Sequence, residues 1–168
     1  MNLLEMFAPI RTFVFDIDGV LTDGSLLLTE DNHMLRSMNI KDGYALQLAV
    51  KKGYAVWVIS GGKSEAARLR LHKLGITDVH IGIDNKKEFL ERLIRVAKTT
   101  YDTMLYMGDD IPDYAAMKLC VLPCCPNDAA SEIKQISKYT SPYDGGKGCV
   151  RDVIEKVMKL NGHWDLPV

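Results

Sequence analysis

An apolar run at residues 10–15 ends directly in two aspartates, Asp16 and Asp18, and Gly19 follows. The β-branched and aromatic residues of this run are typical of a buried strand. Side chains two positions apart in a strand point to the same face, so the two carboxylates can lie close together where the strand ends. Crowded carboxylates repel each other unless a cation lies between them, and Mg²⁺ prefers oxygen ligands. The alternative is that Asp18 and Gly19 only form a turn that closes the strand.

Strand-like apolar runs alternate with helix-like segments along the chain, and the links between them are short. This alternation predicts an α/β fold with a doubly wound parallel sheet. A chain of 168 residues is suited to one domain, which we expect to span residues 1–168. We expect strands at residues 10–15, 55–60, 79–81, 103–107, 120–122 and 139–140, and helices at residues 44–52, 64–74, 86–98, 129–137 and 150–160, with a short helix after Pro112.

Two short apolar runs flank a polar turn at residues 30–33 and predict a β-hairpin over about residues 25–38, after the first strand. The leucines at 26–28 are more apolar than a hairpin exposed to water should be, so we expect a partner surface there. Asp42 follows the hairpin and is expected to cap the next helix.

The composition argues against several classes of protein. A net charge of −1 does not indicate a nucleic-acid or membrane-surface partner, and no apolar run approaches the length of a transmembrane helix. The first residues lack the basic flank and cleavage site of a signal peptide. The spacing of the four cysteines fits neither a zinc site nor a disulfide framework, so we expect reduced thiols and a cytoplasmic protein.

Polar residues follow three of the predicted strands. Ligands of a doubly wound sheet bind beyond the carboxyl ends of its strands, so we expect these residues to converge on one crevice. They are Asp16 and Asp18 after the first strand, Ser60, Gly61 and Gly62 after the second, and Gly108, Asp109 and Asp110 after a later one.

Such a set of residues could carry out phosphoryl transfer, which depends mostly on positioning and charge neutralisation. Asp16 and Asp109 can share one Mg²⁺ ion, while Asp110 or Asp113 holds water molecules bound to it. Asp16 can attack phosphorus and form an aspartyl-phosphate, which divides a very slow hydrolysis into two steps. Asp18 can protonate the leaving alcohol and then accept a proton from water, so we expect it to contact the metal through its backbone carbonyl.

The phosphate also needs hydrogen-bond donors and positive charge. We expect Ser60 and the amides of Gly61 and Gly62 to lie at a helix N-terminus, where N–H groups and the helix dipole favour an anion. Lys86, at the start of its own helix, adds a point charge suited to a phosphate oxygen. Taken alone, each residue has an ordinary explanation: a helix cap for Ser60, a solvated side chain for Lys86 and a loop for the aspartates.

The combined set resembles the haloacid dehalogenase (HAD) superfamily of phosphatases, on residues 16–19, Ser60, Lys86 and residues 108–113. The match covers nearly the whole chain and implies a Rossmann-like fold, magnesium and an aspartyl-phosphate intermediate. The intervals from Asp18 to Ser60 and from Ser60 to Lys86 are too short for the cap domain of many relatives, so we expect a capless protein.

A closer resemblance, on residues 18–24, 39–44 and 145–152, is to the 3-deoxy-D-manno-octulosonate 8-phosphate phosphatases of lipopolysaccharide biosynthesis. This branch implies a sugar acid phosphate as substrate and a homotetramer whose hairpins pack together, with each site closed by a neighbouring subunit. The tail at residues 162–165 could fold over a neighbour's site or be frayed. The substrate-binding residues implied by the resemblance are Asp18, Asn39, Ile40, Lys41, Asp42, Gly43, Gly61, Gly62, Lys86 and Arg70, the last for the substrate carboxylate.

Two alternatives remain open from the sequence. A phosphatase of a nonulosonate 9-phosphate is the first, and Gly62 argues against it because a relative that prefers nine-carbon acids has glutamate there. A catalytically idle, phosphatase-like assembly subunit is the second. It would be expected to have lost part of the motif, whereas Asp16, Asp18 and Lys86 are all present.

Overall fold

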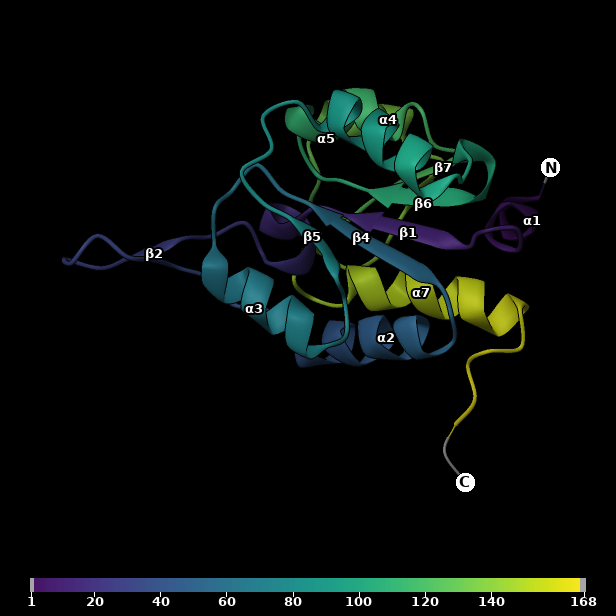
Figure 1. Cartoon of the computed structure of the whole chain (residues 1–168), viewed down its shortest axis with the longest axis horizontal. Helices are drawn as coiled ribbons and strands as arrows, with labels where there is room; N and C mark the ends of the chain where they lie inside the picture. Colours follow the sequence, from purple (N-terminus) through teal and green to yellow (C-terminus); the bar gives the residue numbers. More distant parts are fainter. Residues whose placement is uncertain (1, 167–168) are drawn as a thin grey trace.

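A six-stranded parallel sheet forms the centre of the molecule (Figure 1). The computed structural model describes residues 2–166. The strands lie in the order β5-β4-β1-β6-β7-β8, and every neighbouring pair is parallel. The predicted doubly wound sheet is therefore confirmed. The strands are β1 (Thr12–Phe15), β4 (Ala55–Ile59), β5 (Asp78–His80), β6 (Met104–Met107), β7 (Leu122–Cys125) and β8 (Tyr139–Thr140).

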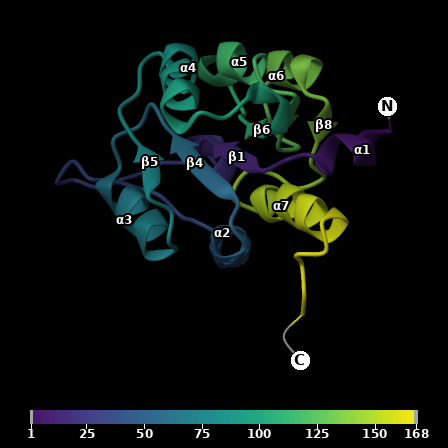
Figure 2. The ribbon, with the colours of Figure 1, turned by 45° about the vertical axis from the view of Figure 1, so that its right-hand side comes forward.

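Helices cover both faces of the sheet (Figure 2). On one face lie α4, α5 and α6, and on the other α2, α3 and α7, with α2 packed directly on α7. Within the described residues none of these helices is long and apolar enough to cross a membrane. Their bounds are α1 (Leu3–Phe7), α2 (Ile40–Lys51), α3 (Glu65–Lys73), α4 (Lys86–Ala97), α5 (Ile111–Met117), α6 (Ser131–Ile136) and α7 (Cys149–Leu160).

Strand β1 is apolar throughout because both of its faces are buried. Phe13 and Phe15 point into the core under α2 and α7, whereas Val14 points into the core under α4, α5 and α6. A strand covered on both faces shows a continuous apolar run rather than an alternating one. Strand β1 pairs with β4 on one side and with β6 on the other. The chain places β4 and β5 on one side of β1 and then β6, β7 and β8 on the other, so the order of strands in the sheet reverses at β1. This reversal is where such folds place their ligands.

The predicted hairpin is present and projects away from the sheet (Figure 1). It consists of β2 (Leu27–Leu28) and β3 (Met34–Leu35), which pair antiparallel. Leu27 and Leu28 remain 66% and 69% exposed. Within the described residues, the link from β1 to α2 holds only this hairpin and a turn, and the link from β4 to α4 holds only α3 and β5. The chain is capless, as predicted.

Two local predictions need correction, and one short helix was not predicted. The strand expected at residues 120–122 is wrong, because β7 runs over Leu122–Cys125 and includes Pro123. Proline is disfavoured inside sheets, but Pro123 still accepts a hydrogen bond from Lys138 N through its carbonyl. Helix α2 begins at Ile40, earlier than predicted, and is capped by Asn39 rather than Asp42. The short α1, which residues 2–7 form with a capping box, was not predicted.

The C-terminal tail packs on its own chain. Tyr54 Oη and His163 Nδ1 lie 2.8 Å apart, and Trp164 meets the Tyr44 ring edge-on. The Arg151 guanidinium lies over the Trp164 ring at 5.2 Å. These contacts hold residues 163 and 164 beside α2 and α7.

Candidate active site

A cavity of about 290 Å³ lies beyond the carboxyl ends of β1, β4 and β6. The three polar clusters that follow these strands meet there, as the sequence predicts. The cavity is lined by Asp16, Asp18, Gly24, Ser60, Gly61, Gly62, Lys86, Asp109, Asp110, Pro112 and Asp113.

Lys86 lies between two buried carboxylates. Its Nζ is 3.0 Å from Oδ1 of Asp16 and 2.8 Å from Oδ1 of Asp113. All three residues are buried. Burial acts to lower the pKa of Lys86, but Asp113 and Asp16 outweigh it and raise that pKa above its usual value. The lysine is therefore a fixed positive charge inside the site.

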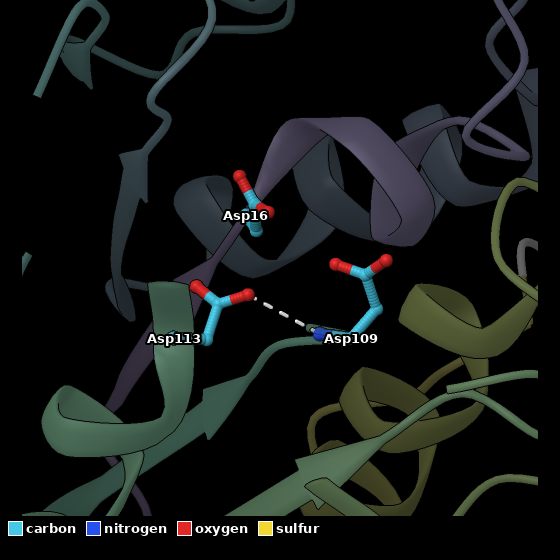
Figure 3. Close-up of side chains that lie close together, drawn as sticks. All are labelled: Asp16, Asp109 and Asp113. Carbon is cyan, nitrogen blue, oxygen red and sulfur yellow. Dashed lines mark hydrogen bonds between the residues drawn. The ribbon is translucent and has the colours of Figure 1, made fainter. Parts of the chain in front are cut away.

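Asp113 accepts three hydrogen bonds from the protein, one of them from Lys86. Its Oδ1 also accepts a hydrogen bond from Tyr106 Oη at 3.0 Å, and its Oδ2 accepts one from Asp109 N at 3.2 Å (Figure 3). Asp113 thus orients Lys86 and the backbone at Asp109. Tyr106 was missed from the sequence, where its one signal was a phenol in a strand that is otherwise apolar.

Asp16, Asp109 and Asp113 each bring one carboxylate oxygen within 4.8 Å of the other two (Figure 3). Burial and the charge of Asp113 raise the pKa of Asp16 well above its usual value. The same two causes raise the pKa of Asp109 to about 7. A divalent cation would relieve this repulsion, and a hard oxygen set is what Mg²⁺ prefers. Because Asp113 already accepts three hydrogen bonds from the protein, we expect Asp16 and Asp109 to be the carboxylates that hold the ion.

Gly19 leaves the space that the Asp109 carboxylate occupies. A Cβ at position 19 would lie 1.8 Å from Asp109 Oδ2, so the carboxylate packs directly on the glycine backbone. Gly19 also has φ of +86°, in the left-handed region. No other residue type fits this turn without moving Asp109. The predicted turn at Asp18 and Gly19 is therefore present, and it lies against Asp109, one of the three clustered carboxylates.

Asp18 does not join this carboxylate cluster. Its carboxylate accepts two hydrogen bonds from Arg36, which follows strand β3 of the hairpin. Asp110 is also outside the cluster, because its Oδ1 accepts a hydrogen bond from Ile111 N and caps α5. Arg36 was missed from the sequence, since nothing in its spacing from Asp18 indicates a contact.

Ser60 is buried at the end of β4, and its Oγ accepts a hydrogen bond from Gly62 N at 3.2 Å. The expectation that this segment lies at a helix N-terminus is wrong. Helix α3 begins only at Glu65, and Ser64 caps it. A phosphate would therefore be held here by a loop and by Lys86, without the aligned amides of a first helical turn.

The remaining predicted residues lie elsewhere in this chain. Asn39, Ile40 and Lys41 line a separate cavity of about 760 Å³ beside α7. Asp42 is buried and accepts a hydrogen bond from Arg151 N at 2.8 Å, and burial raises its pKa to about 6. Arg70 lines a third cavity, of about 260 Å³, between the hairpin and α3. Of the described residues 39–43 and Arg70, none lines the aspartate cavity.

A doubly wound capless sheet with this aspartate and lysine cluster at its switch point defines a phosphatase of the haloacid dehalogenase superfamily. The chain is 30% identical to the 3-deoxy-D-manno-octulosonate 8-phosphate phosphatase KdsC of Escherichia coli K12 over 156 residues, which cover 93% of this chain and 83% of the relative. It belongs to the KdsC family.

Solved structures agree with this assignment. A probable YrbI family phosphatase from Pseudomonas syringae superposes with a TM-score of 0.93 and 30% identity, covering 96% of this chain and 92% of the other. A 3-deoxy-D-manno-octulosonate 8-phosphate phosphatase from Moraxella catarrhalis, in complex with magnesium, phosphate and KDO, has a TM-score of 0.90 and 26% identity, with 94% and 91% covered. A comparison with models of protein families gave no match.

Proposed function

We propose that the chain hydrolyses 3-deoxy-D-manno-octulosonate 8-phosphate to 3-deoxy-D-manno-octulosonate and phosphate. The observation that carries this proposal is the intact aspartate and lysine cluster in a member of the KdsC family. The Moraxella relative, bound to magnesium, phosphate and KDO, supports the same sugar acid.

Asp16 is the proposed nucleophile. One of its oxygens attacks phosphorus while the phosphorus–oxygen bond to the sugar breaks, giving an aspartyl-phosphate. Lys86 lies 3.0 Å from Oδ1 of Asp16 and keeps the nucleophile fixed near the phosphate. Ser60, at the rim of the same cavity, is placed to donate to a phosphate oxygen.

Magnesium would be held by the carboxylates of Asp16 and Asp109 and by the backbone carbonyl of Asp18, while Asp110 and Asp113 would contact water molecules bound to the ion. Bound there, the ion supplies positive charge that offsets the charge of the phosphate and the carboxylates. The close packing of Asp109 on Gly19 keeps that carboxylate aimed at the site without the metal.

Asp18 is the proposed acid and base. It gives its proton to the sugar oxygen as the alcohol leaves, and takes a proton from the water that attacks the aspartyl-phosphate. The second attack breaks the bond between phosphorus and Asp16 and restores the free carboxylate.

We further propose a homotetramer in which neighbouring subunits close each site. The exposed leucines of the hairpin would pack against one another, since a patch of this kind on a monomer usually marks an interface. Arg70 and residues 39–41, which lie outside the aspartate cavity of their own chain, would contact the sugar acid across such an interface, whereas Asp42 and Gly43 are buried and would only support that segment. The four cysteines are unpaired, which fits a reducing, cytoplasmic compartment.

Phosphate release from a panel of esters tests the substrate. The panel contains the octulosonate 8-phosphate, a nonulosonate 9-phosphate, arabinose 5-phosphate and p-nitrophenyl phosphate, each with saturating magnesium. We expect the highest kcat/KM for the eight-carbon acid. A higher value for the nine-carbon acid would identify the alternative substrate, and no turnover of any ester would identify an idle subunit.

A further inference from the structure

Arg36 reaches from the hairpin to Asp18, which lines the candidate active site. Its Nε donates to Asp18 Oδ1 at 2.6 Å, and its Nη2 donates to Asp18 Oδ2 at 3.2 Å. Its Nη1 donates to the Met34 carbonyl at 3.3 Å, which holds the guanidinium against its own strand. A two-point pair of this kind fixes orientation as well as distance.

Asp18 has no second anchor among the described residues, since Arg36 supplies every hydrogen bond that its carboxylate accepts. Asp18 (φ −71°, ψ 120°) and Gly19 (φ +86°, ψ −5°) form the centre of a type II turn, which fixes the backbone at Asp18 but not its side chain. By contrast, Asp16 accepts a hydrogen bond from Ile17 N and contacts Lys86. Without Arg36, the Asp18 side chain would be free to occupy other rotamers.

Asp18 lines the aspartate cavity, and Arg36 lies behind it, on the side of the cavity between the hairpin and α3. The Arg36 side chain is 12% exposed, and that of Asp18 is 35% exposed toward the cavity. A Cβ at Gly62 would lie 2.9 Å from Asp18 Oδ2 and 3.3 Å from Arg36 Nη2. Gly62 therefore leaves the space that this pair occupies, next to Ser60.

We propose that Arg36 is a positioning residue that holds the carboxyl group of Asp18 where it exchanges protons with the substrate. The inference rests on the proposed phosphatase function. When Asp16 bonds to phosphorus and the sugar oxygen leaves, the proton of Asp18 goes to that oxygen. When water then bonds to phosphorus and the bond to Asp16 breaks, the proton of the water returns to Asp18. Arg36 acts through Asp18 and links its orientation to that of the hairpin.

The test compares two esters that differ in their need for a proton. The sugar oxygen of an alkyl phosphate must be protonated as it leaves, whereas p-nitrophenyl phosphate releases a stable anion. We expect Arg36→Met to lower kcat/KM for the octulosonate 8-phosphate by about 10- to 100-fold, with only a small change for p-nitrophenyl phosphate. Arg36→Lys, which keeps the charge but not the two-point geometry, should give an intermediate ratio. Arg68→Met is the control, because Arg68 pairs with Glu65 on the surface of α3.

An equal loss on both esters, or an unchanged ratio of the two kcat/KM values, would overturn the positioning role. If Arg36→Met does not fold, as shown by the lack of a cooperative melting transition, the ratio of the two kcat/KM values measured for Arg36→Lys tests the positioning role instead. If the wild-type protein prefers another alkyl phosphate, the proposed substrate is wrong, and the same ratio measured with that ester still tests Arg36. The two proposals therefore fail separately.

Discussion

The ammonium group of Lys86 lies 3.0 Å from Oδ1 of Asp16, although both residues are buried. The same nitrogen is 2.8 Å from Asp113, so one cation balances two carboxylates in a region with little water. Burying charged groups costs free energy of desolvation, and the attraction between the ion-pair partners offsets this cost only while all of the partners are present. Lys86 therefore stabilises the fold as well as being placed to bind the phosphate.

Replacing Lys86 with methionine should destabilise the protein by about 3–5 kcal/mol at pH 7.5, because it leaves buried carboxylates without a counter-charge. Urea unfolding of the magnesium-free protein measures this change. Lys87→Met is the matched control, since Lys87 is the next residue of α4 and is exposed. Similar losses in the two variants would contradict the ion-pair account.

Replacing Asp16 with asparagine should lower kcat by at least about 1,000-fold, because the amide cannot form the aspartyl-phosphate. Phosphate release from the octulosonate 8-phosphate measures the loss. Asp31→Asn serves as the control, since Asp31 is exposed at the tip of the hairpin. A rate within tenfold of wild type would show that Asp16 is not the nucleophile.

Asp109→Asn should weaken magnesium binding, because it replaces one of the two carboxylates that could hold the ion. We expect the increase in melting temperature caused by magnesium to be largely lost in this variant and retained in Asp31→Asn. Calorimetric titration with magnesium gives the same comparison without turnover. If Asp109→Asn binds magnesium with unchanged affinity, Asp109 is not a ligand of the ion.

The stability of the magnesium-free protein should fall as the pH rises from about 4 to about 7. Burial and neighbouring carboxylates raise the folded-state pKa of Asp109 to about 7 and that of Asp16 well above the usual 3.8. The folded protein therefore binds more protons than the unfolded chain in this window, and stability is lost as these protons leave. Melting curves across the window, with Asp109→Asn as the variant that should show a weaker dependence, measure the effect. A stability that rises over this window would contradict it.

Leu28→Asp should shift the protein from the proposed tetramer toward smaller species, because it puts a charge into the apolar hairpin surface. Sedimentation velocity measures the assembly state. Val96→Asp is the control, since Val96 is a similarly exposed apolar residue on α4, at 76% against 69% for Leu28. A wild-type protein that sediments as a monomer would refute the assembly, and equal shifts in both variants would refute the hairpin's part in it.

Local patterns predicted five of the six strands of the sheet, and the rule that ligands of a doubly wound sheet bind beyond the carboxyl ends of its strands predicted that their polar ends converge. The apolar run before Asp16 and the glycine-aspartate segment after β6 each mark a strand end whatever its neighbours are. Strand β7 was predicted at the wrong residues because it contains Pro123, and proline, which has no N–H to donate, is rare inside sheets. The helix expected at residues 64–74 starts where predicted, with Ser64 as its cap and Glu65 as its first residue, so Ser60 to Gly62 lie in the loop before it and not at its N-terminus.

Contacts between distant segments could not be predicted in this way. Arg36 meets Asp18, and Tyr106 meets Asp113, only after the hairpin and the sheet have taken their places. No spacing rule connects such pairs in a single sequence. The placement of residues 39–43 away from the aspartate cavity has the same cause, because the position of α2 is set by packing against α7.

The central position of β1 has a consequence for how the protein becomes active during synthesis. Phe15 pairs with Val58 of β4 on one side and with Met107 of β6 on the other. Asp109 follows β6, so this second proposed metal ligand reaches Asp16 only after β6 has been synthesised and has joined the sheet. An emerging chain that ends before β6 would carry the nucleophile without Asp109. Non-local pairings of this kind slow folding. The ability to bind magnesium should therefore be among the last properties to appear when the chain refolds.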